Sequence, residues 1–201
     1  PGSSTNMFVN ALLARGGLTH DDVSIIGVGS GQSAVAAMLG GHLDALANIE
    51  PAVTMLVRSG KAGEKIETIS EQGARELYGA ALPSGSLYTK LEFLRDHPAT
   101  VQALTNAMVR ASKWIQNAGP GDIIKVVPEQ YLLGDRAVYI DAFLAAKAAL
   151  SPDGMFPEKG AETALRALVS ADPKIASAKP DLKVVFTNKF AKAANAKYPK
   201  G

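Results

Sequence analysis

Glycine and polar residues gather at three points of the chain, each directly before a predicted helix. The first is Pro1–Thr5 (PGSST), which precedes a helix predicted over 6–15. A helix N-terminus carries free N–H groups and the positive end of the helix dipole, so it favours an anion. The hydroxyl-rich turn therefore predicts a cradle for the acidic group of a small ligand. The structural alternative is that Ser4 or Thr5 only caps the helix.

The second turn is Gly29-Ser30-Gly31-Gln32-Ser33, between a predicted strand and a predicted helix. Ligands of parallel α/β sheets bind beyond the carboxyl ends of the strands. We therefore expect the amide groups of this turn and the Gln32 side chain to face the same crevice as the first turn. Ala34 occupies the place of the third glycine of a dinucleotide fingerprint, so nucleotide binding is not expected.

The third turn contains Asn48 and Glu50. Pro51 follows at once and opens a helix predicted to run to about residue 59. The N-terminus of this helix would stabilise the Glu50 carboxylate, which is the structural alternative. The functional one is that Glu50 faces a cationic or hydrogen-donating part of a ligand. The sequence places no second carboxylate and no nucleophile with its base here, so binding without catalysis is predicted.

Composition narrows the function further. The 201 residues are 47% hydrophobic and 20% charged, which is typical of a folded globular domain. The net charge is +2 and the basic residues are scattered, so no nucleic-acid partner is expected. Cysteine is absent and the three histidines are far apart, which indicates no metal site and no cofactor. Charged residues interrupt every apolar stretch before it could span a membrane.

The elements that would position the three turns follow from hydrophobic periodicity and from glycine and proline. Strands alternating with short helices up to about residue 75 predict an α/β fold with a largely parallel sheet. Beyond that point the chain becomes mainly helical. The predicted strands or extended segments are 22–28, 43–49, 66–70, 77–82, 86–90 and 183–187, and the predicted helices are 6–15, 32–39, 51–59, 98–117, 121–127, 136–150 and 161–170, with a terminal turn from 189.

Four sequence features together resemble the substrate-binding proteins of nitrate/sulfonate/taurine-type ABC transporters, whose wider group includes thiamine-precursor binders. They are PGSST opening a helix, a strand-loop-helix unit ending in Gly-Gly before LDAL, a strand ending in Glu-Pro, and the later run FLRDHPATVQALTNAMVRASKWIQ. The resemblance spans nearly the whole chain. It implies a two-lobed α/β fold of the periplasmic-binding-protein type II class, with the ligand clamped between the lobes.

The resemblance also implies a domain division. Residues 1–75 would be most of the second lobe, and 76–201 the hinge and the C-terminal, helix-rich part of the first. The initial strands of the first lobe and a signal peptide would lie upstream. The implied contacts to the anionic group of the ligand come from Ser3, Ser4 and Thr5, and the implied lining of the same cleft comes from Gly31, Gln32 and Glu50.

The function implied is that of a periplasmic or extracytoplasmic solute-binding component of an importer. It would be a monomer that binds a small anion such as a sulfonate, taurine or nitrate and delivers it to membrane permease subunits. Two alternatives share the fold: the ligand-sensing effector domain of a LysR-type regulator, and a protein that binds or synthesises the thiamine pyrimidine precursor. The synthesising enzymes carry a cysteine-rich motif, and the lack of cysteine argues against them.

Overall fold

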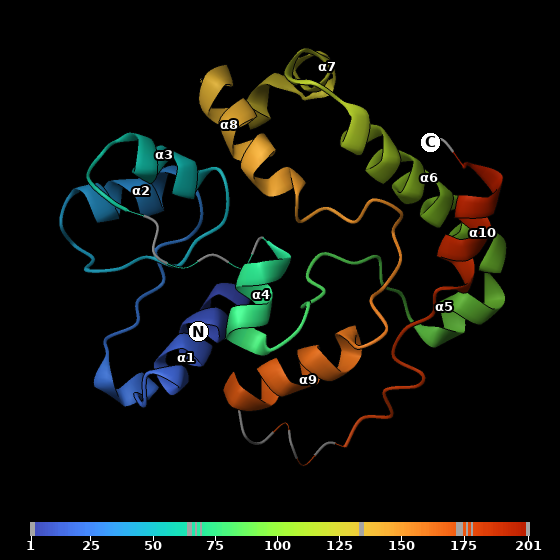
Figure 1. Cartoon of the computed structure of the whole chain (residues 1–201), viewed down its shortest axis with the longest axis horizontal. Helices are drawn as coiled ribbons and strands as arrows, with labels where there is room; N and C mark the ends of the chain where they lie inside the picture. Colours follow the sequence, from blue (N-terminus) through green and yellow to red (C-terminus); the bar gives the residue numbers. More distant parts are fainter. Residues whose placement is uncertain are drawn as a thin grey trace.

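The computed structural model describes residues 3–63, 66, 68, 70–132, 135–171, 175, 177 and 179–199, and Figure 1 shows their arrangement. Turns and irregular segments connect its helices. The elements are α1 (Ser4–Arg15), η1 (His20–Asp22), α2 (Gln32–Leu39), α3 (Ala52–Arg58), α4 (Glu71–Tyr78), α5 (Leu91–Asp96), α6 (Pro98–Asn117), α7 (Pro120–Val126), η2 (Glu129–Tyr131), α8 (Arg136–Lys147), α9 (Gly160–Ala171) and α10 (Lys189–Lys197).

Helices with clear local signals lie where the sequence predicts them. The bounds of α2 and α6 agree with the prediction residue for residue. Pro98 occupies the first turn of α6, where its missing N–H costs nothing. The buried residues of α6 include Val101 and Val109, whereas Leu104 and Met108 are 48% and 55% exposed. Packing against α10 selects this face.

Among the α-helices of the described residues, α4, α5 and α10 were not predicted. The signals for α4 are Ser70, whose Oγ accepts a hydrogen bond from the Gly73 N–H at 3.0 Å, and Gly79, which ends the helix with φ 78°. Serine at the N-cap and a left-handed glycine after the last turn are ordinary helix boundaries. The extended segment predicted over 77–82 is therefore wrong at its start, because residues 77–78 belong to α4.

The described residues contain no β-strand, which corrects the strands predicted over 22–28, 43–49 and 183–187. The sequence 22–28 is rich in β-branched residues, but propensity alone does not form a strand, since a strand requires a neighbouring backbone to pair with. No backbone hydrogen bond joins 23–29 to another described segment. The strand predicted over 66–70 lies partly outside the described residues.

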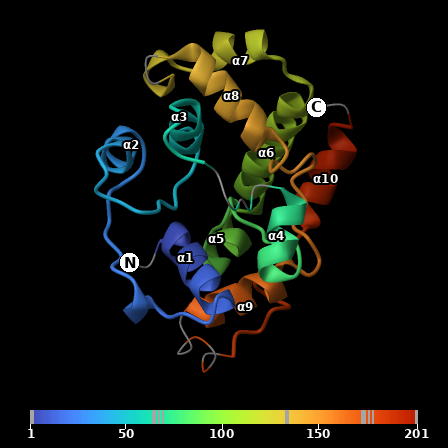
Figure 2. The same ribbon diagram turned by 60° about the vertical axis from the view of Figure 1, so that its left-hand side comes forward.

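The helices pack in small groups. Figures 1 and 2 show α2 beside α3 and α6 beside α10, while α1 and α4 both pack on α9. The buried core between α2 and α3 consists of Val35, Ala52 and Leu56. A second core joins Val109 of α6 to Ala191 and Ala194 of α10. Among the helices described, none is long and apolar enough to cross a membrane.

The division into two lobes at residue 75 stays a prediction. This position falls inside α4. Helices from both sides of it are in contact, since α1 packs on α9 and α3 packs on α8.

Candidate functional site

The first turn is a capped helix N-terminus. Ser3 is the N-cap of α1, and its Oγ accepts a hydrogen bond from the Asn6 backbone N–H at 3.2 Å. The same oxygen lies 2.9 Å from Thr5 Oγ1. The cap is therefore Ser3, not Ser4 or Thr5, and the helix begins two residues earlier than Asn6, where it was predicted to start. Ser3 and Ser4 are exposed and Thr5 is half-buried.

The second turn leaves the N-terminus of α2 open. Gly31 is its N-cap, with φ 91°, a backbone conformation that favours glycine because it has no Cβ. No side chain caps this helix, and the backbone N–H groups of 32–34 have no partner among the described residues. Ser33 closes the turn, because its Oγ donates to the Val28 carbonyl at 2.9 Å. Gln32 is exposed.

The third turn contains a carboxylate that already has a structural role. Glu50 Oε2 accepts a hydrogen bond from the Thr54 backbone N–H at 3.1 Å, in the first turn of α3. The helix begins at Ala52 with Pro51 as its N-cap, one residue later than predicted. Glu50 is half-buried. Its geometry agrees with the structural alternative, in which the carboxylate stabilises the helix N-terminus.

Asn48 joins the second and third turns. Its Nδ2 donates to the Gly29 carbonyl at 3.2 Å, and its Oδ1 accepts from the Ile49 backbone N–H at 2.9 Å. The first of these bonds therefore holds the loop before α2 to the loop before α3. Within the described residues no hydrogen bond connects this pair of turns to residues 3–5. Whether all three turns face one ligand stays a prediction.

A small cavity of about 80 Å³ lies between α3 and α8. This volume is well below the roughly 300–1,000 Å³ typical of sites for larger organic ligands. Asp135 is the charged residue of its lining, but its Oδ1 accepts hydrogen bonds from the N–H groups of Ala137 and Val138 at 2.9 and 3.0 Å. The cavity is lined by Pro51, Met55, Leu132, Asp135, Val138 and Tyr139.

Sequence reasoning missed this cavity, because its two walls are about 80 residues apart and no local pattern indicates their contact. It is separate from the predicted ligand residues: none of them lines the cavity, although Pro51 follows Glu50 directly. Of the lining residues, only Asp135 has a role that the sequence indicates, because it is an aspartate at the N-cap position of a predicted helix.

A carboxylate with a perturbed pKa lies on the segment that leads from α1 to the second turn. The Thr19 backbone N–H and hydroxyl both donate to Asp22 Oδ2, at 2.8 and 2.9 Å. These bonds stabilise the ionised form and lower the pKa of Asp22, with the backbone bond as the larger cause. The pair forms a capping box around the short helix η1.

Comparison with known proteins identifies the family. No curated protein matches the chain. A solved structure from Bordetella bronchiseptica RB50 is 49% identical in sequence, superposes with a TM-score of 0.92, and covers 99% of this chain. The chain spans 63% of that protein's chain. The model of the NMT1-like family matches residues 1–126, which include all three turns. The chain therefore belongs to the NMT1-like family, whose members are of the periplasmic-binding type.

Proposed function

We propose that the protein is the solute-binding component of an ABC importer and reversibly binds a small anion such as a sulfonate, taurine or nitrate. Membership of the NMT1-like family supports a solute-binding role. The proposal places the protein outside the cytoplasm, where it would deliver the solute to membrane permease subunits. It acts as a binding protein without turnover, because the three turns offer hydroxyl, amide and carboxylate groups and no paired nucleophile and base.

The observation that carries the anion preference is the open N-terminus of α2. Three backbone N–H groups there, at 32–34, lack a partner among the described residues. Such groups bind anions because they donate hydrogen bonds and lie at the positive end of the helix dipole. The hydrogen bond from Asn48 to the Gly29 carbonyl fixes the loop that leads into this helix. The exposed Gln32 side chain adds a further donor at the same end.

The variant Gln32→Pro tests this proposal. Proline is favoured at the first position of a helix, so α2 should form while one N–H group and the Gln32 side chain are lost. A hydrogen bond to a charged group contributes about 1.5–3 kcal/mol, so affinity should fall about tenfold or more. The affinity is measured by isothermal titration calorimetry with taurine, a simple alkanesulfonate and nitrate. Thermal unfolding checks that the variant keeps its fold.

Leu91→Pro is the matched control, because it also places proline at the first position of a helix, here α5. It should leave affinity unchanged. If neither variant alters binding of any of these anions, the N-terminus of α2 is not the anion site. A chemically changed anion recovered after incubation with the unmodified chain would contradict the binding role and indicate an enzyme.

A further inference from the structure

Two adjacent helices, α6 and α10, carry all of the chain's net positive charge. They contain five basic residues and no acidic one, whereas the rest of the chain has more acidic than basic residues. The two helices pack side by side, and α10 lies at the edge of the molecule in Figures 1 and 2. Basic residues that are scattered along the sequence thus gather on one pair of helices. They are Arg110, Lys113, Lys189, Lys192 and Lys197.

Exposed side chains of these helices form two rows. On α10, Lys189, Ala193 and Lys197 follow one another at intervals of four residues and are all exposed. Side chains four apart lie on the same face of a helix. On α6, Arg110 and Trp114 have the same spacing and are also exposed. We call these five residues the basic surface.

The two rows meet at Tyr198. Arg110 Cζ lies 5.1 Å from the centre of the Tyr198 ring, and Lys197 Nζ lies 5.4 Å from it. A third cation, Lys113, donates a hydrogen bond from its Nζ to the Tyr198 carbonyl. Within the described part of the chain, none of these three cations forms an ion pair with a carboxylate. Positive charges held together without a counter-charge attract an anion.

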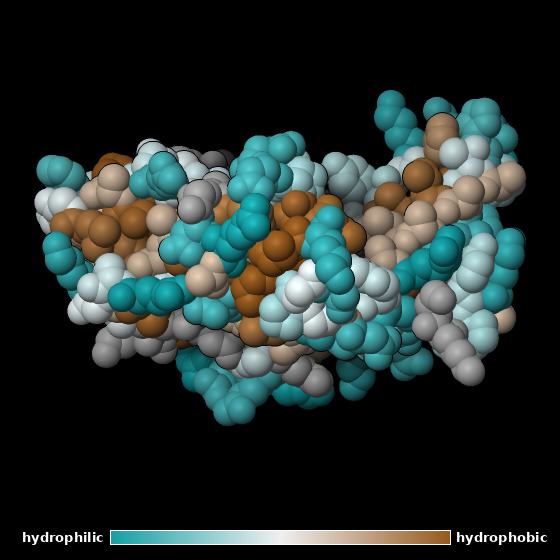
Figure 3. Space-filling model, turned by 90° about the horizontal axis from the view of Figure 1, so that it is seen from above, coloured by the Kyte–Doolittle hydropathy of each residue, from teal (hydrophilic) through white to brown (hydrophobic). Residues whose placement is uncertain are grey.

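The form and composition of the basic surface favour a membrane as that anion. The surface is the outer side of two helices, and the cavity described above lies elsewhere, between α3 and α8. Trp114, beside the cations, is 42% exposed. Tryptophan is enriched where membranes meet water, because its ring is apolar and its N–H group is polar. Figure 3, with this end of the molecule on the right, shows hydrophilic side chains protruding and apolar ones between them.

We propose that the basic surface docks the protein on a membrane rich in anionic phospholipid. Its lysines and Arg110 contact the headgroup phosphates, and Trp114 enters the interface between headgroups and acyl chains. Each basic side chain close to such a membrane strengthens binding about fivefold. The inference goes beyond the proposed function and does not depend on which solute is bound. For a solute-binding component, docking would keep the protein near the membrane that holds its permease.

Co-sedimentation of the 201-residue chain with lipid vesicles tests the proposal. One set of vesicles contains phosphatidylglycerol and phosphatidylcholine in equal parts, and the other contains phosphatidylcholine alone. We expect binding to the first set to be about tenfold tighter or more. Raising the salt from about 0.1 M to about 1 M shortens the Debye length from about 10 Å to about 3 Å and should remove most of this binding.

The fluorescence of Trp114 reports where the chain touches the vesicle. The chain contains one tryptophan, so its emission comes from the basic surface without any labelling. On vesicles with phosphatidylglycerol the emission should shift to shorter wavelength, because the ring leaves water. On phosphatidylcholine alone it should stay unchanged.

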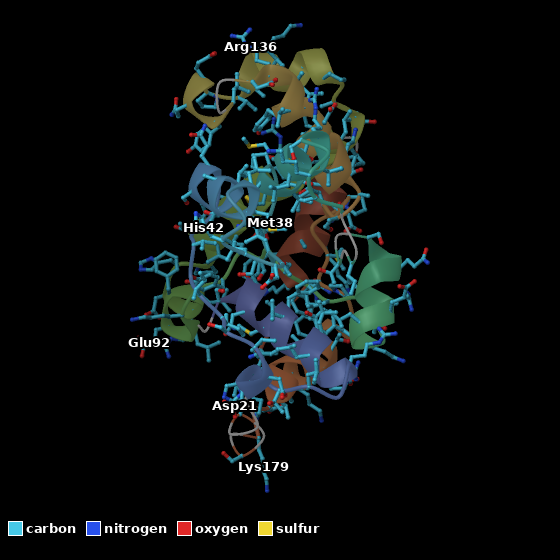
Figure 4. The ribbon with its side chains drawn as sticks, turned by 90° about the vertical axis from the view of Figure 1, so that its left-hand side faces the viewer. Asp21, Met38, His42, Glu92, Arg136 and Lys179 are labelled. Carbon is cyan, nitrogen blue, oxygen red and sulfur yellow. The ribbon has the colours of Figure 1, made fainter. Side chains whose placement is uncertain are left out.

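Lys189→Glu is the variant that tests the basic surface. Lys189 is the first residue of α10, where a glutamate favours the helix, so the fold should be kept. Lys61→Glu is the matched control, because Lys61 is also exposed and both substitutions change the net charge by the same amount. Lys61 follows α3, which lies with α2 at the opposite end of the molecule from α10. Figure 4 faces that end and labels Met38 and His42 there.

Lys189→Glu should weaken binding to vesicles with phosphatidylglycerol about fivefold or more. Lys61→Glu should change this binding less than about twofold, because Lys61 is not part of the basic surface. Circular dichroism of both variants checks that the helices are retained. Equal losses in the two variants would overturn the proposal, since overall charge and not the basic surface would then decide binding.

Four further results would overturn it. Equal binding to both sets of vesicles would show that anionic headgroups are not recognised. Unchanged Trp114 emission from vesicle-bound protein would place the contact elsewhere. Release from the vesicles by inorganic phosphate at an ionic strength where sodium chloride does not release the chain would identify a site for a single anion. Tighter binding to polyglutamate than to the vesicles would identify an acidic protein as the partner.

Discussion

Removal of the Glu50 carboxylate separates its structural role from a role in ligand binding. In the structure its Oε2 accepts a hydrogen bond from the Thr54 N–H at 3.1 Å, at the start of α3. Replacement of a side chain that caps a helix by alanine costs about 0.5–2 kcal/mol. Glu50→Gln keeps an acceptor and loses only the favourable charge at the helix N-terminus, which contributes about 0.3–1 kcal/mol. We therefore expect Glu50→Ala to destabilise the protein more than Glu50→Gln.

Thermal unfolding followed by circular dichroism measures this difference. For a chain of this size, each 1 kcal/mol lost lowers Tm by about 2–4 °C. Glu92→Gln is the matched control, because Glu92 is an exposed glutamate in the first turn of α5. Both glutamine variants should lower Tm only slightly, whereas Glu50→Ala should lower it clearly.

Ligand affinity is the second measurement on the same variants. Because the Glu50 carboxylate is hydrogen-bonded to α3, the substitution Glu50→Gln should change the affinity for taurine or nitrate less than threefold. A carboxylate about 4 Å from a bound anion would instead repel it by about 4 kcal/mol at an effective dielectric constant near 20. In that case the ligand would need an ammonium or N–H group beside its acidic end. A tenfold or greater loss of taurine affinity in Glu50→Gln, with unchanged Tm, would refute our assignment of Glu50 to the helix.

Replacing residues 3–5 together by alanine should lower anion affinity at least tenfold, because each lost hydroxyl bond is worth about 0.5–1.5 kcal/mol. It should also lower Tm, since the N-cap of α1 is lost; Ser70→Ala, which removes the cap of α4, should lower Tm alone. Affinity within twofold of the unmodified chain would mean that these residues only cap the helix. The two bonds from Thr19 keep the pKa of Asp22 below its ordinary value of 3.8, so their stabilising effect is present above that pH and is lost as the pH falls through the lowered pKa. Asp22→Asn should make unfolding less sensitive to acid in this range, and an NMR titration that finds an ordinary Asp22 pKa would contradict this.

The sequence predicted where the individual turns of the site lie, but not the hydrogen bonds within and between them. Helices begin at the three turns, as the glycine, serine and proline patterns indicate: α1 begins at Ser4, α2 at Gln32, and α3 at Ala52 directly after Pro51. The sequence did not decide which serine caps α1, nor whether Glu50 is bonded to its helix. It named Asn48 without indicating that this side chain holds Gly29. These outcomes depend on which groups come within hydrogen-bond distance once the chain is folded.

The sequence alone determined α2 and α6, because the hydrogen bonds of a helix join residues four apart and its boundaries depend on neighbouring residues such as Pro98. Tertiary structure decided the rest. The β-branched run at 23–29 became an unpaired segment because strand formation needs a partner that is distant in sequence. The buried face of α6 was set by α10, more than 70 residues later in the chain, and the cavity beside Pro51 exists only because α3 meets α8. Contacts between distant segments leave no local pattern, which is why the sequence could not predict them.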